Sequence, residues 1–346
     1  MGGALAAIGA LWHHARPMAA LRVLEFIRHA DPMWNLPQPL VEDLRRRFPE
    51  VTIDSPRDQA EAEGLLPEAD IVLGWAVKQD NFARARRLQW IQVTAASVAG
   101  LLFPALVDSP VQVTNGRGLW SEAMADHTIG AMMMFARKLH LARDRQNERR
   151  WTQSELNEGA PFRSLRGATL GLIGFGTIGS AIAERASALG MNVIAVRRHP
   201  ATDPAPAHEQ WPVERMPELI ERAEWLVLST PLTAETRGMI GAPELSRMRK
   251  DAVLINLGRG PLIDEPALID ALERGVIAGA SLDVFDREPL PADHPLWAFP
   301  QVILTPHISG LGDRLWERAT DLFARNLTAF REGRPLENLV DKRAGY

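Results

Sequence analysis

The chain of 346 residues is long enough for two domains that each bury a core of their own. Its composition, with 46% hydrophobic and 24% charged residues, is ordinary for a soluble protein, and the net charge of -4 excludes the strongly basic class of nucleic-acid-binding proteins. The absence of cysteine excludes a disulfide scaffold, a catalytic thiolate and cysteine metal ligands, so we expect a cytoplasmic protein without a metal site.

We expect residues 1–20 to form a disordered extension. The apolar run at residues 2–12 is not preceded by Lys or Arg and is too short to cross a bilayer. A weak signal peptide is the alternative. No other stretch approaches the length of a transmembrane helix, so we expect no membrane partner.

From residue 21 onward, short apolar runs alternate with longer helical patterns, which is typical of βαβ units and parallel sheets. The runs at 21–26, 71–73 and 90–94 predict strands, and the pattern at 40–48 predicts a helix. A long helical pattern begins at Ser121. Its methionine stripe indicates a core face or a subunit interface and consists of Met124, Met132, Met133 and Met134.

The next feature is a glycine-rich turn between a strand (170–173) and a helix that ends near residue 190, followed by a second strand (192–196). Its glycines are Gly174, Gly176 and Gly179, in the spacing G-x-G-x-x-G. In this βαβ setting the pattern predicts a dinucleotide site, with the pyrophosphate at the helix N-terminus. Arg197 and Arg198 stand at the end of the second strand, where NAD-selective sites carry an acid. We therefore expect a preference for NADP(H), with NAD(H) as the alternative.

Three ionisable residues follow three further apolar runs. Arg259 comes after 253–255, Glu288 after 280–284 and His307 after 302–304. Because the carboxyl ends of parallel strands meet at one edge of a sheet, we expect these side chains to converge. A guanidinium at the end of a buried strand also requires a negative partner. The set suits reduction of a 2-keto acid, with Arg259 on the substrate carboxylate and His307, oriented by Glu288, as the proton donor.

The chain resembles the D-isomer-specific 2-hydroxyacid dehydrogenases from about residue 21 to residue 340. The motifs that carry the resemblance are GLIGFGTIG, STPLTAETRGMI, LINLGRGPLIDEPALIDAL, SLDVFDREPLPADHPLW and VILTPHISG. The resemblance assigns substrate binding to Arg259 and the acid–histidine pair to Glu288 and His307. It also implies further cofactor contacts at Thr177, Ile178, Thr230, Pro231, Thr236, Leu257, Gly258, Asp283 and Gly310. For Asp283, an acid satisfied by backbone donors is the alternative.

The resemblance implies an α/β fold of two Rossmann-like domains with parallel sheets, in which a cofactor domain (121–312) is inserted into a discontinuous substrate domain (21–120 and 313–346). It further implies a homodimer and a substrate of the glyoxylate or hydroxypyruvate type, reduced to the D-2-hydroxy acid. A phosphite-type dehydrogenase and a cofactor-sensing, corepressor-like binding protein are the alternatives.

The substrate loop departs from the family pattern. Where the family has S-x-G-V-D, this chain reads TAASVAGLL, so that Ser97 replaces the usual glycine. Backbone donors at Ala96 and Ser97 remain able to bind a carboxylate, and Trp75 is expected to line the pocket. This departure leaves the identity of the substrate open.

Overall fold

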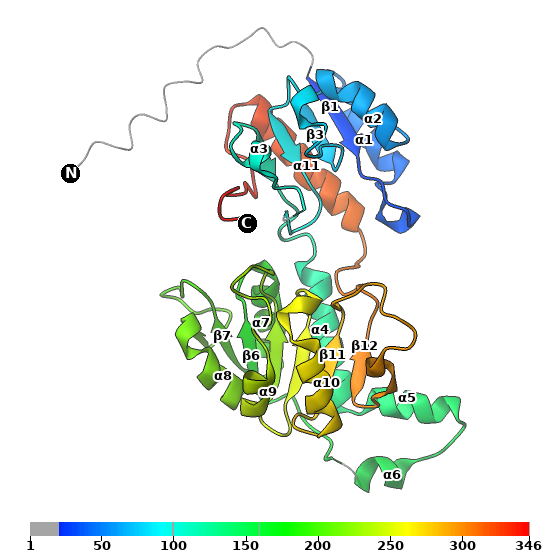
Figure 1. The fold of residues 1–346 in the computed structure, drawn as a ribbon, viewed down its shortest axis with the longest axis vertical. Coiled ribbons are helices and arrows are strands. Elements are labelled where there is room, and N and C mark those ends of the chain that lie inside the picture. Colours follow the sequence, from blue (N-terminus) through cyan, green and yellow to red (C-terminus); the bar gives the residue numbers. More distant parts are fainter. Residues whose placement is uncertain (1–20, 99, 159, 346) are drawn as a thin grey trace, which may run out of the picture. The chain divides into compact units, whose positions relative to one another are not determined.

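The computed structural model describes residues 21–345 except Ala99 and Gly159. The expected extension, residues 1–20, lies outside the described residues. The chain forms two compact units. Among the described residues, the outer unit contains residues 21–116 and those from Trp316 onward, and the inserted unit is Arg117–Leu315 (Figure 1). These borders lie within a few residues of the expected division at 120/121 and 312/313.

The outer unit contains a parallel sheet of five strands in the order β2-β1-β3-β4-β5. Its strands are β1 (Arg22–Phe26), β2 (Thr52–Asp54), β3 (Ile71–Gly74), β4 (Trp90–Gln92) and β5 (Gln112–Thr114). The sequence predicted β1, β3 and β4. It gave no signal for β2 and β5, because each is a three-residue strand with a single apolar residue and so shows no apolar run.

Helices cover both faces of this sheet: α1 (Gln38–Arg47), α2 (Gln59–Leu65), α3 (Pro104–Val107) and α11 (Leu315–Arg331). Successive strand residues point to opposite faces. Val23 packs in the cluster that contains α1 and Phe323 of α11, whereas Leu24 packs in the cluster that contains α2 and Leu106 of α3. The C-terminal helix therefore completes a core begun by the N-terminal third, which makes this unit discontinuous in sequence.

The inserted unit contains a parallel sheet of seven strands in the order β12-β11-β10-β9-β6-β7-β8. They are β6 (Thr169–Ile173), β7 (Asn192–Val196), β8 (Glu209–Trp211), β9 (Trp225–Leu228), β10 (Val253–Asn256), β11 (Gly279–Leu282) and β12 (Val302–Leu304). The chain runs outward from β6 to β8, returns to β9 and continues to β12. The topological switch point, where ligands bind in such sheets, therefore lies between β6 and β9. The two parallel sheets confirm the expected α/β fold with one unit inserted into the other.

Two clusters of helices sandwich this second sheet. One face packs against α4 (Ser121–Ala136) and α7 (Thr177–Ala188). The other packs against α8 (Met216–Arg222), α9 (Ala242–Arg247) and α10 (Glu265–Glu273). Met124 and Met132 are buried in the first of these cores, so half of the methionine stripe is core rather than surface.

The prediction of one long helix from Ser121 is wrong in one respect, because the structure divides this stretch into separate helices. Lys138 has a left-handed backbone (φ 54°) and separates α4 from α5 (Leu139–Asn147), which is followed by α6 (Gln153–Glu158). The Lys138 ammonium donates to the Leu156 carbonyl and lies 4.8 Å from the centre of the Phe162 ring. Both partners lie outside α4 and α5, so the spacing of apolar residues within the helical pattern does not indicate the break.

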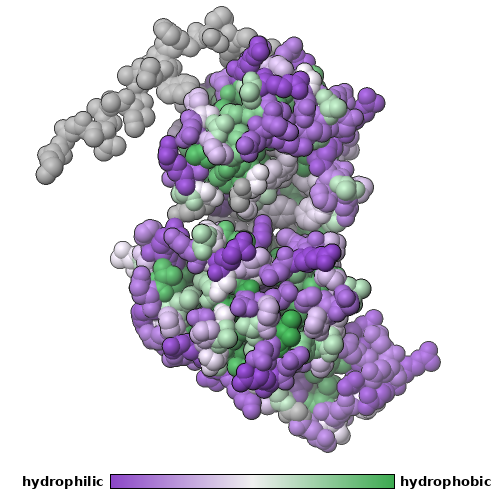
Figure 2. All heavy atoms as spheres, in the orientation of Figure 1, coloured by the Kyte–Doolittle hydropathy of each residue, from purple (hydrophilic) through white to green (hydrophobic). Residues whose placement is uncertain are grey.

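Figure 2 shows hydrophilic residues interspersed with apolar ones on the visible face of each unit. Over the described part of the chain, no helix combines the length and the apolar character needed to cross a membrane.

Candidate active site

The glycine turn follows β6, at the switch point of the inserted unit's sheet. Gly174 has a φ of +97°, and an added Cβ would lie 2.8 Å from the Ser229 backbone. A Cβ at Gly179 would lie 2.5 Å from the Gly174 carbonyl oxygen. These two glycines are therefore required by the protein's own packing: one makes the tight turn, and the other lets α7 approach the strand.

Gly176 is different, because a Cβ placed there would meet nothing within 4 Å. The residue precedes α7, and no side chain caps that helix. Backbone N–H groups of the first turn, including those of Thr177 and Ile178, have no partner within the helix and carry its partial positive charge. A glycine with open space in front of an uncapped helix suits a ligand whose anionic group approaches the backbone. The residues present therefore fit a dinucleotide pyrophosphate.

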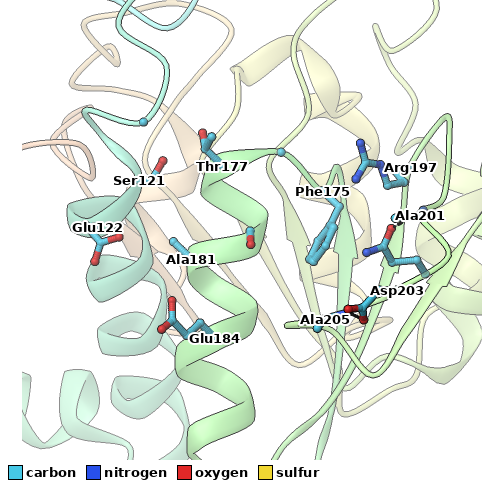
Figure 3. Close-up of a pocket in the computed structure, with 14 residues that line it drawn as sticks. Ser121, Glu122, Phe175, Thr177, Ala181, Glu184, Arg197, Ala201, Asp203 and Ala205 are labelled. Carbon is cyan, nitrogen blue, oxygen red and sulfur yellow. Dashed lines mark hydrogen bonds between the residues drawn. The ribbon is translucent and has the colours of Figure 1, made fainter. Parts of the chain in front are cut away.

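A pocket of about 610 Å³ adjoins this turn, between α4, α7 and the loop after β7 (Figure 3). Arg197 lines the pocket, as do Phe175 and Thr177. The neighbouring Arg198 forms an ion pair with Glu235 at 2.8 Å instead. Of the two arginines singled out in the sequence, only Arg197 lines this pocket.

The loop after β9 carries three of the expected cofactor contacts and lies against the same turn. The Ser229 hydroxyl donates to the Gly174 carbonyl at 2.9 Å. Within the loop, the Thr236 hydroxyl donates to the Pro231 carbonyl at 2.8 Å. A Cβ at Gly258 would lie 2.9 Å from the Thr230 carbonyl oxygen, so the β10 exit also touches this loop. The expected contacts Thr230, Pro231, Thr236 and Gly258 are thus gathered at one edge of the sheet.

Arg259 follows β10, and its side chain is exposed. Its Nη1 donates to the Gly258 carbonyl at 2.7 Å. The turn is held by Asn256, whose Nδ2 donates to the Arg259 carbonyl at 2.9 Å. The expectation of a buried guanidinium is therefore corrected: the strand is buried, but the arginine beyond it is not, so desolvation does not demand an anion. Sequence reasoning missed Asn256, although it stands three residues before Arg259 in the motif LINLGRGPLIDEPALIDAL.

Gly260 brings the arginine turn against the loop after β11. A Cβ at Gly260 would lie 2.0 Å from the Phe285 carbonyl carbon and 2.4 Å from the Asp286 nitrogen, so only glycine fits. The Phe285 amide donates to Glu288 Oε1 at 3.0 Å. The close approach of two backbones thus links the exit of β10, which carries Arg259, to the loop that positions Glu288.

The imidazole of His307 completes the group. Its Nδ1 lies 2.7 Å from Glu288 Oε2, and both side chains are partly exposed. The His307 backbone has a φ of 55°, in the left-handed region that costs a residue with a side chain about 1–3 kcal/mol. This conformation persists because the surrounding hydrogen bonds hold it, and the first is from the His307 amide to the Asp283 carbonyl at 2.9 Å.

The Asp283 carboxylate organises the loop that carries His307. Asp283 is 1% exposed, and its oxygens accept hydrogen bonds from the Thr305 hydroxyl at 2.6 Å and from the amides of Ile308 and Ser309, both at 2.9 Å. Two of these donors are backbone amides, as in the alternative left open by the sequence, and the third is a side-chain hydroxyl. A cofactor contact of Asp283 stays a prediction.

Two residues that the sequence analysis did not assign to the site extend this network. The Thr305 hydroxyl lies 3.4 Å from Nε2 of His127 on α4. Burial lowers the pKa of His127, although the charge of Asp283 opposes the shift. Burial thus favours the neutral form of this ring. The signal for Thr305 was its place in the T-P-H motif.

The remaining predicted positions lie on several different loops. Leu257 is buried behind the arginine turn, and Gly310 packs so closely on Trp120 that a Cβ would lie 2.8 Å from the ring. Ala96 and Ser97 are exposed after β4 of the outer unit, and Trp75 follows β3. The Ala96 carbonyl accepts a hydrogen bond from Asn115 Nδ2 at 2.8 Å. Among the residues that the structure describes, no group of three or more His, Cys, Asp or Glu forms a candidate metal site.

The chain is similar in sequence to known dehydrogenases and reductases. The family model for D-isomer specific 2-hydroxyacid dehydrogenase, NAD binding domain, matches residues 129–309. A glyoxylate reductase of Korarchaeum cryptofilum is 32% identical over 337 residues, covering 96% of this chain and 89% of that protein. A glyoxylate reductase of Thermococcus litoralis is 34% identical over 309 residues, covering 88% and 86%.

Solved structures give the same result. A D-isomer specific 2-hydroxyacid dehydrogenase from Xanthobacter autotrophicus, in complex with NADPH and MES, has a TM-score of 0.77 and 29% identity over 95% of this chain and 100% of that chain. An NADPH-dependent glyoxylate/hydroxypyruvate reductase from Sinorhizobium meliloti, in complex with NADP and sulfate, has a TM-score of 0.79 and 26% identity over 94% and 100%.

Proposed function

We infer the function from the family to which the chain belongs, the D-isomer specific 2-hydroxyacid dehydrogenases, which are oxidoreductases that use a nicotinamide cofactor. We propose that the chain reduces a small 2-keto acid of the glyoxylate or hydroxypyruvate type to the D-2-hydroxy acid. We further propose that NADPH is its preferred cofactor. The observation that carries the proposal is the 2.7 Å contact between His307 Nδ1 and Glu288 Oε2. The loop of Glu288 packs against Gly260, the residue that follows Arg259.

The proton donor in this proposal is His307. Glu288 holds Nδ1, which leaves Nε2 to give its proton to the carbonyl oxygen of the substrate. The adjacent carboxylate fixes the plane of the ring through its hydrogen bond with Nδ1. When bound at the glycine turn, the nicotinamide cofactor supplies the hydride. The loop after β9 and the residues Gly176, Thr177 and Ile178 would hold that cofactor.

Arg259 is proposed to bind the substrate carboxylate. Its guanidinium is exposed and can turn toward an incoming anion, and a guanidinium matches a carboxylate with two parallel hydrogen bonds. In the same position it polarises the keto oxygen as negative charge develops there. We also propose that residues 21–120 and 313–346 form the substrate domain, in which Trp75 and the backbone N–H groups of Ala96 and Ser97 bind substrate, and that residues 121–312 form the cofactor domain.

Arg197 supports the preference for NADPH, because it lines the pocket beside the glycine turn while Arg198 is engaged by Glu235. The test is kcat/KM with NADPH and NADH for the parent, Arg197→Asp and Arg198→Asp. We expect Arg197→Asp to favour NADH by about 10- to 100-fold relative to the parent, since it replaces attraction of the 2′-phosphate by repulsion. Arg198→Asp should change the ratio less. A parent that prefers NADH tenfold would contradict the preference.

The substrate class is tested by NADPH oxidation with a panel that contains glyoxylate, hydroxypyruvate, pyruvate and larger 2-keto acids. We expect turnover with the first two, and its loss in His307→Gln. Tight cofactor binding without turnover on any keto acid would instead favour the corepressor-like alternative. Oxidation of phosphite with NADP in the absence of keto acid turnover would favour the phosphite dehydrogenase.

The homodimer is also proposed here. On α5 and the segment after it, Leu139 is 51% exposed and Trp151 is 92% exposed, so a second copy of the chain could cover apolar side chains here. Sedimentation velocity should therefore show a dimer that Trp151→Glu weakens. A monomeric parent at micromolar concentration would contradict it.

A further inference from the structure

The backbone at His307 adopts a conformation that the residue would not choose by itself. Its φ of 55° follows Pro306, and proline holds the preceding Thr305 in an extended conformation. The Thr305 amide donates to the Leu282 carbonyl at 3.0 Å, which continues the ladder between β11 and β12 by one residue. The chain therefore leaves the sheet beside Asp283 and turns sharply at His307.

Four hydrogen bonds to Asp283 define this turn. Its carbonyl accepts from the His307 amide, and its carboxylate accepts from the Ile308 amide, the Ser309 amide and the Thr305 hydroxyl. The donor at 2.6 Å, the hydroxyl, makes the shortest of these contacts. Asp283 is almost completely buried, so these hydrogen bonds replace the water that its carboxylate loses on burial.

The Thr305 hydroxyl has a second neighbour. Because its proton is given to Asp283, its oxygen is an acceptor for Nε2–H of His127, which lies 3.4 Å away on α4. Thr305 thus connects a helix of the inserted unit's core to the buried carboxylate. Thr305 Oγ1 contacts both the Asp283 carboxylate and the His127 ring.

We propose that Thr305 is a positioning residue for His307: by sharing its hydroxyl between Asp283 and His127, it fixes the turn that holds the His307 imidazole against the Glu288 carboxylate. The catalytic consequence rests on the proposed function. The placement of the ring does not, and it can be measured without substrate.

Two variants of Thr305 separate the hydroxyl from the shape of the side chain. Thr305→Val keeps the branched shape and loses the hydroxyl, whereas Thr305→Ser keeps the hydroxyl. A second pair on α4 is His127→Leu, which removes the donor, and His127→Gln, which retains an N–H group at a similar reach. All four are made in the full-length chain, and thermal unfolding confirms that each is folded.

The first readout is nuclear magnetic resonance of protein labelled with ¹⁵N-histidine. The chain has 9 histidines, and the proton on His307 Nδ1 that is hydrogen-bonded to Glu288 is assigned by its loss in His307→Gln. We expect this signal to be lost or shifted in Thr305→Val and His127→Leu, and retained in Thr305→Ser and His127→Gln. The second readout is turnover: kcat should fall about 10- to 100-fold in Thr305→Val, while the dissociation constant for NADPH stays near that of the parent.

The outcomes are distinct. An unchanged signal and unchanged kcat in Thr305→Val would overturn the proposal, and so would an equal loss in Thr305→Ser. An intact signal combined with weakened NADPH binding would also overturn it, because Thr305 and Asp283 would then serve the cofactor. If the signal responds as expected but the parent reduces no 2-keto acid, the positioning role stands and the proposed function falls.

Discussion

Gly260→Ala is the sharpest single test of how the two loops of the active site are joined. The added Cβ would lie 2.0 Å from the Phe285 carbonyl carbon, 2.2 Å from its oxygen and 2.4 Å from the Asp286 nitrogen. Ordinary van der Waals contacts begin at 3.4 Å. The added Cβ and the Phe285 carbonyl carbon, 2.0 Å apart, must therefore separate by about 1.4 Å. All three obstacles are backbone atoms, which cannot move aside as the end of a side chain can.

The size of the effect follows from what the loop carries. Glu288 is bound to the Phe285 amide at 3.0 Å and to His307 at 2.7 Å, so a displacement of Phe285 moves the carboxylate relative to Arg259 or breaks one of these contacts. Catalytic groups tolerate displacements of about 0.5 Å. We therefore expect kcat/KM to fall about 100-fold. Overpacking should also lower the free energy of unfolding by about 1–3 kcal/mol and Tm by roughly 2–12 °C.

The assay is NADPH oxidation with glyoxylate, together with thermal unfolding and the dissociation constant for NADPH. Gly64→Ala is the control, because Gly64 is exposed on α2 and a Cβ there meets nothing within 4 Å. That variant should keep full activity and gain up to about 1 kcal/mol of stability, since alanine is the better helix former. A Gly260→Ala protein that retains both the turnover and the Tm of the parent would refute the account of how the loops are joined.

Three further predictions follow from the same contacts. Arg259→Lys should lower kcat/KM for glyoxylate about 10- to 100-fold, raising KM and lowering kcat with little change in NADPH affinity, because an ammonium cannot make the paired contact; parental kinetics would remove Arg259 from substrate binding. Glu288→Gln should lower kcat at saturating substrate about 100-fold, because a neutral amide is a weaker acceptor for the His307 ring N–H and can turn its NH2 group toward the ring, and a kcat equal to the parent's would count against the pair. Burial lowers the pKa of His127 below 6.5, so the unfolded chain binds this proton more readily and the parent loses stability as the pH falls below that value. Urea unfolding at pH 7.5 and 5.5 should show a smaller loss for His127→Gln, and an equal loss in both proteins would contradict the buried, neutral histidine.

Much of the fold is predictable from local patterns. The βαβ frame around Gly174, Gly176 and Gly179 is one continuous segment, so strand, turn and helix can each be recognised without knowledge of the rest of the chain. The strands β2 and β5 were missed because each contains a single apolar residue and so forms no apolar run. The division of the long helix at Lys138 was missed because its cause, the contacts with Leu156 and Phe162, lies outside the helix.

The candidate site was predicted in part for a similar reason. Arg259, Glu288 and His307 each follow an apolar run, and parallel strands deliver such positions to one edge of a sheet. The burial of Arg259 was misjudged, since a strand pattern reports on the strand and not on the residue beyond it. Arg197 and Arg198 have the same sequence signal, yet only the structure distinguishes the residue in the pocket from the residue paired with Glu235.

The sequence by itself determined the family, the α/β class, the glycine turn and the identity of the three ionisable residues, because these depend on residue types at fixed local spacing. Only the tertiary structure decided that Gly260 serves contact between two loops, that Asp283 holds the turn at His307, and that Thr305 links it to α4. Each of these depends on atoms brought together by neighbouring strands or by a helix packed across the sheet. Such contacts join residues far apart in the chain, and no local pattern contains them.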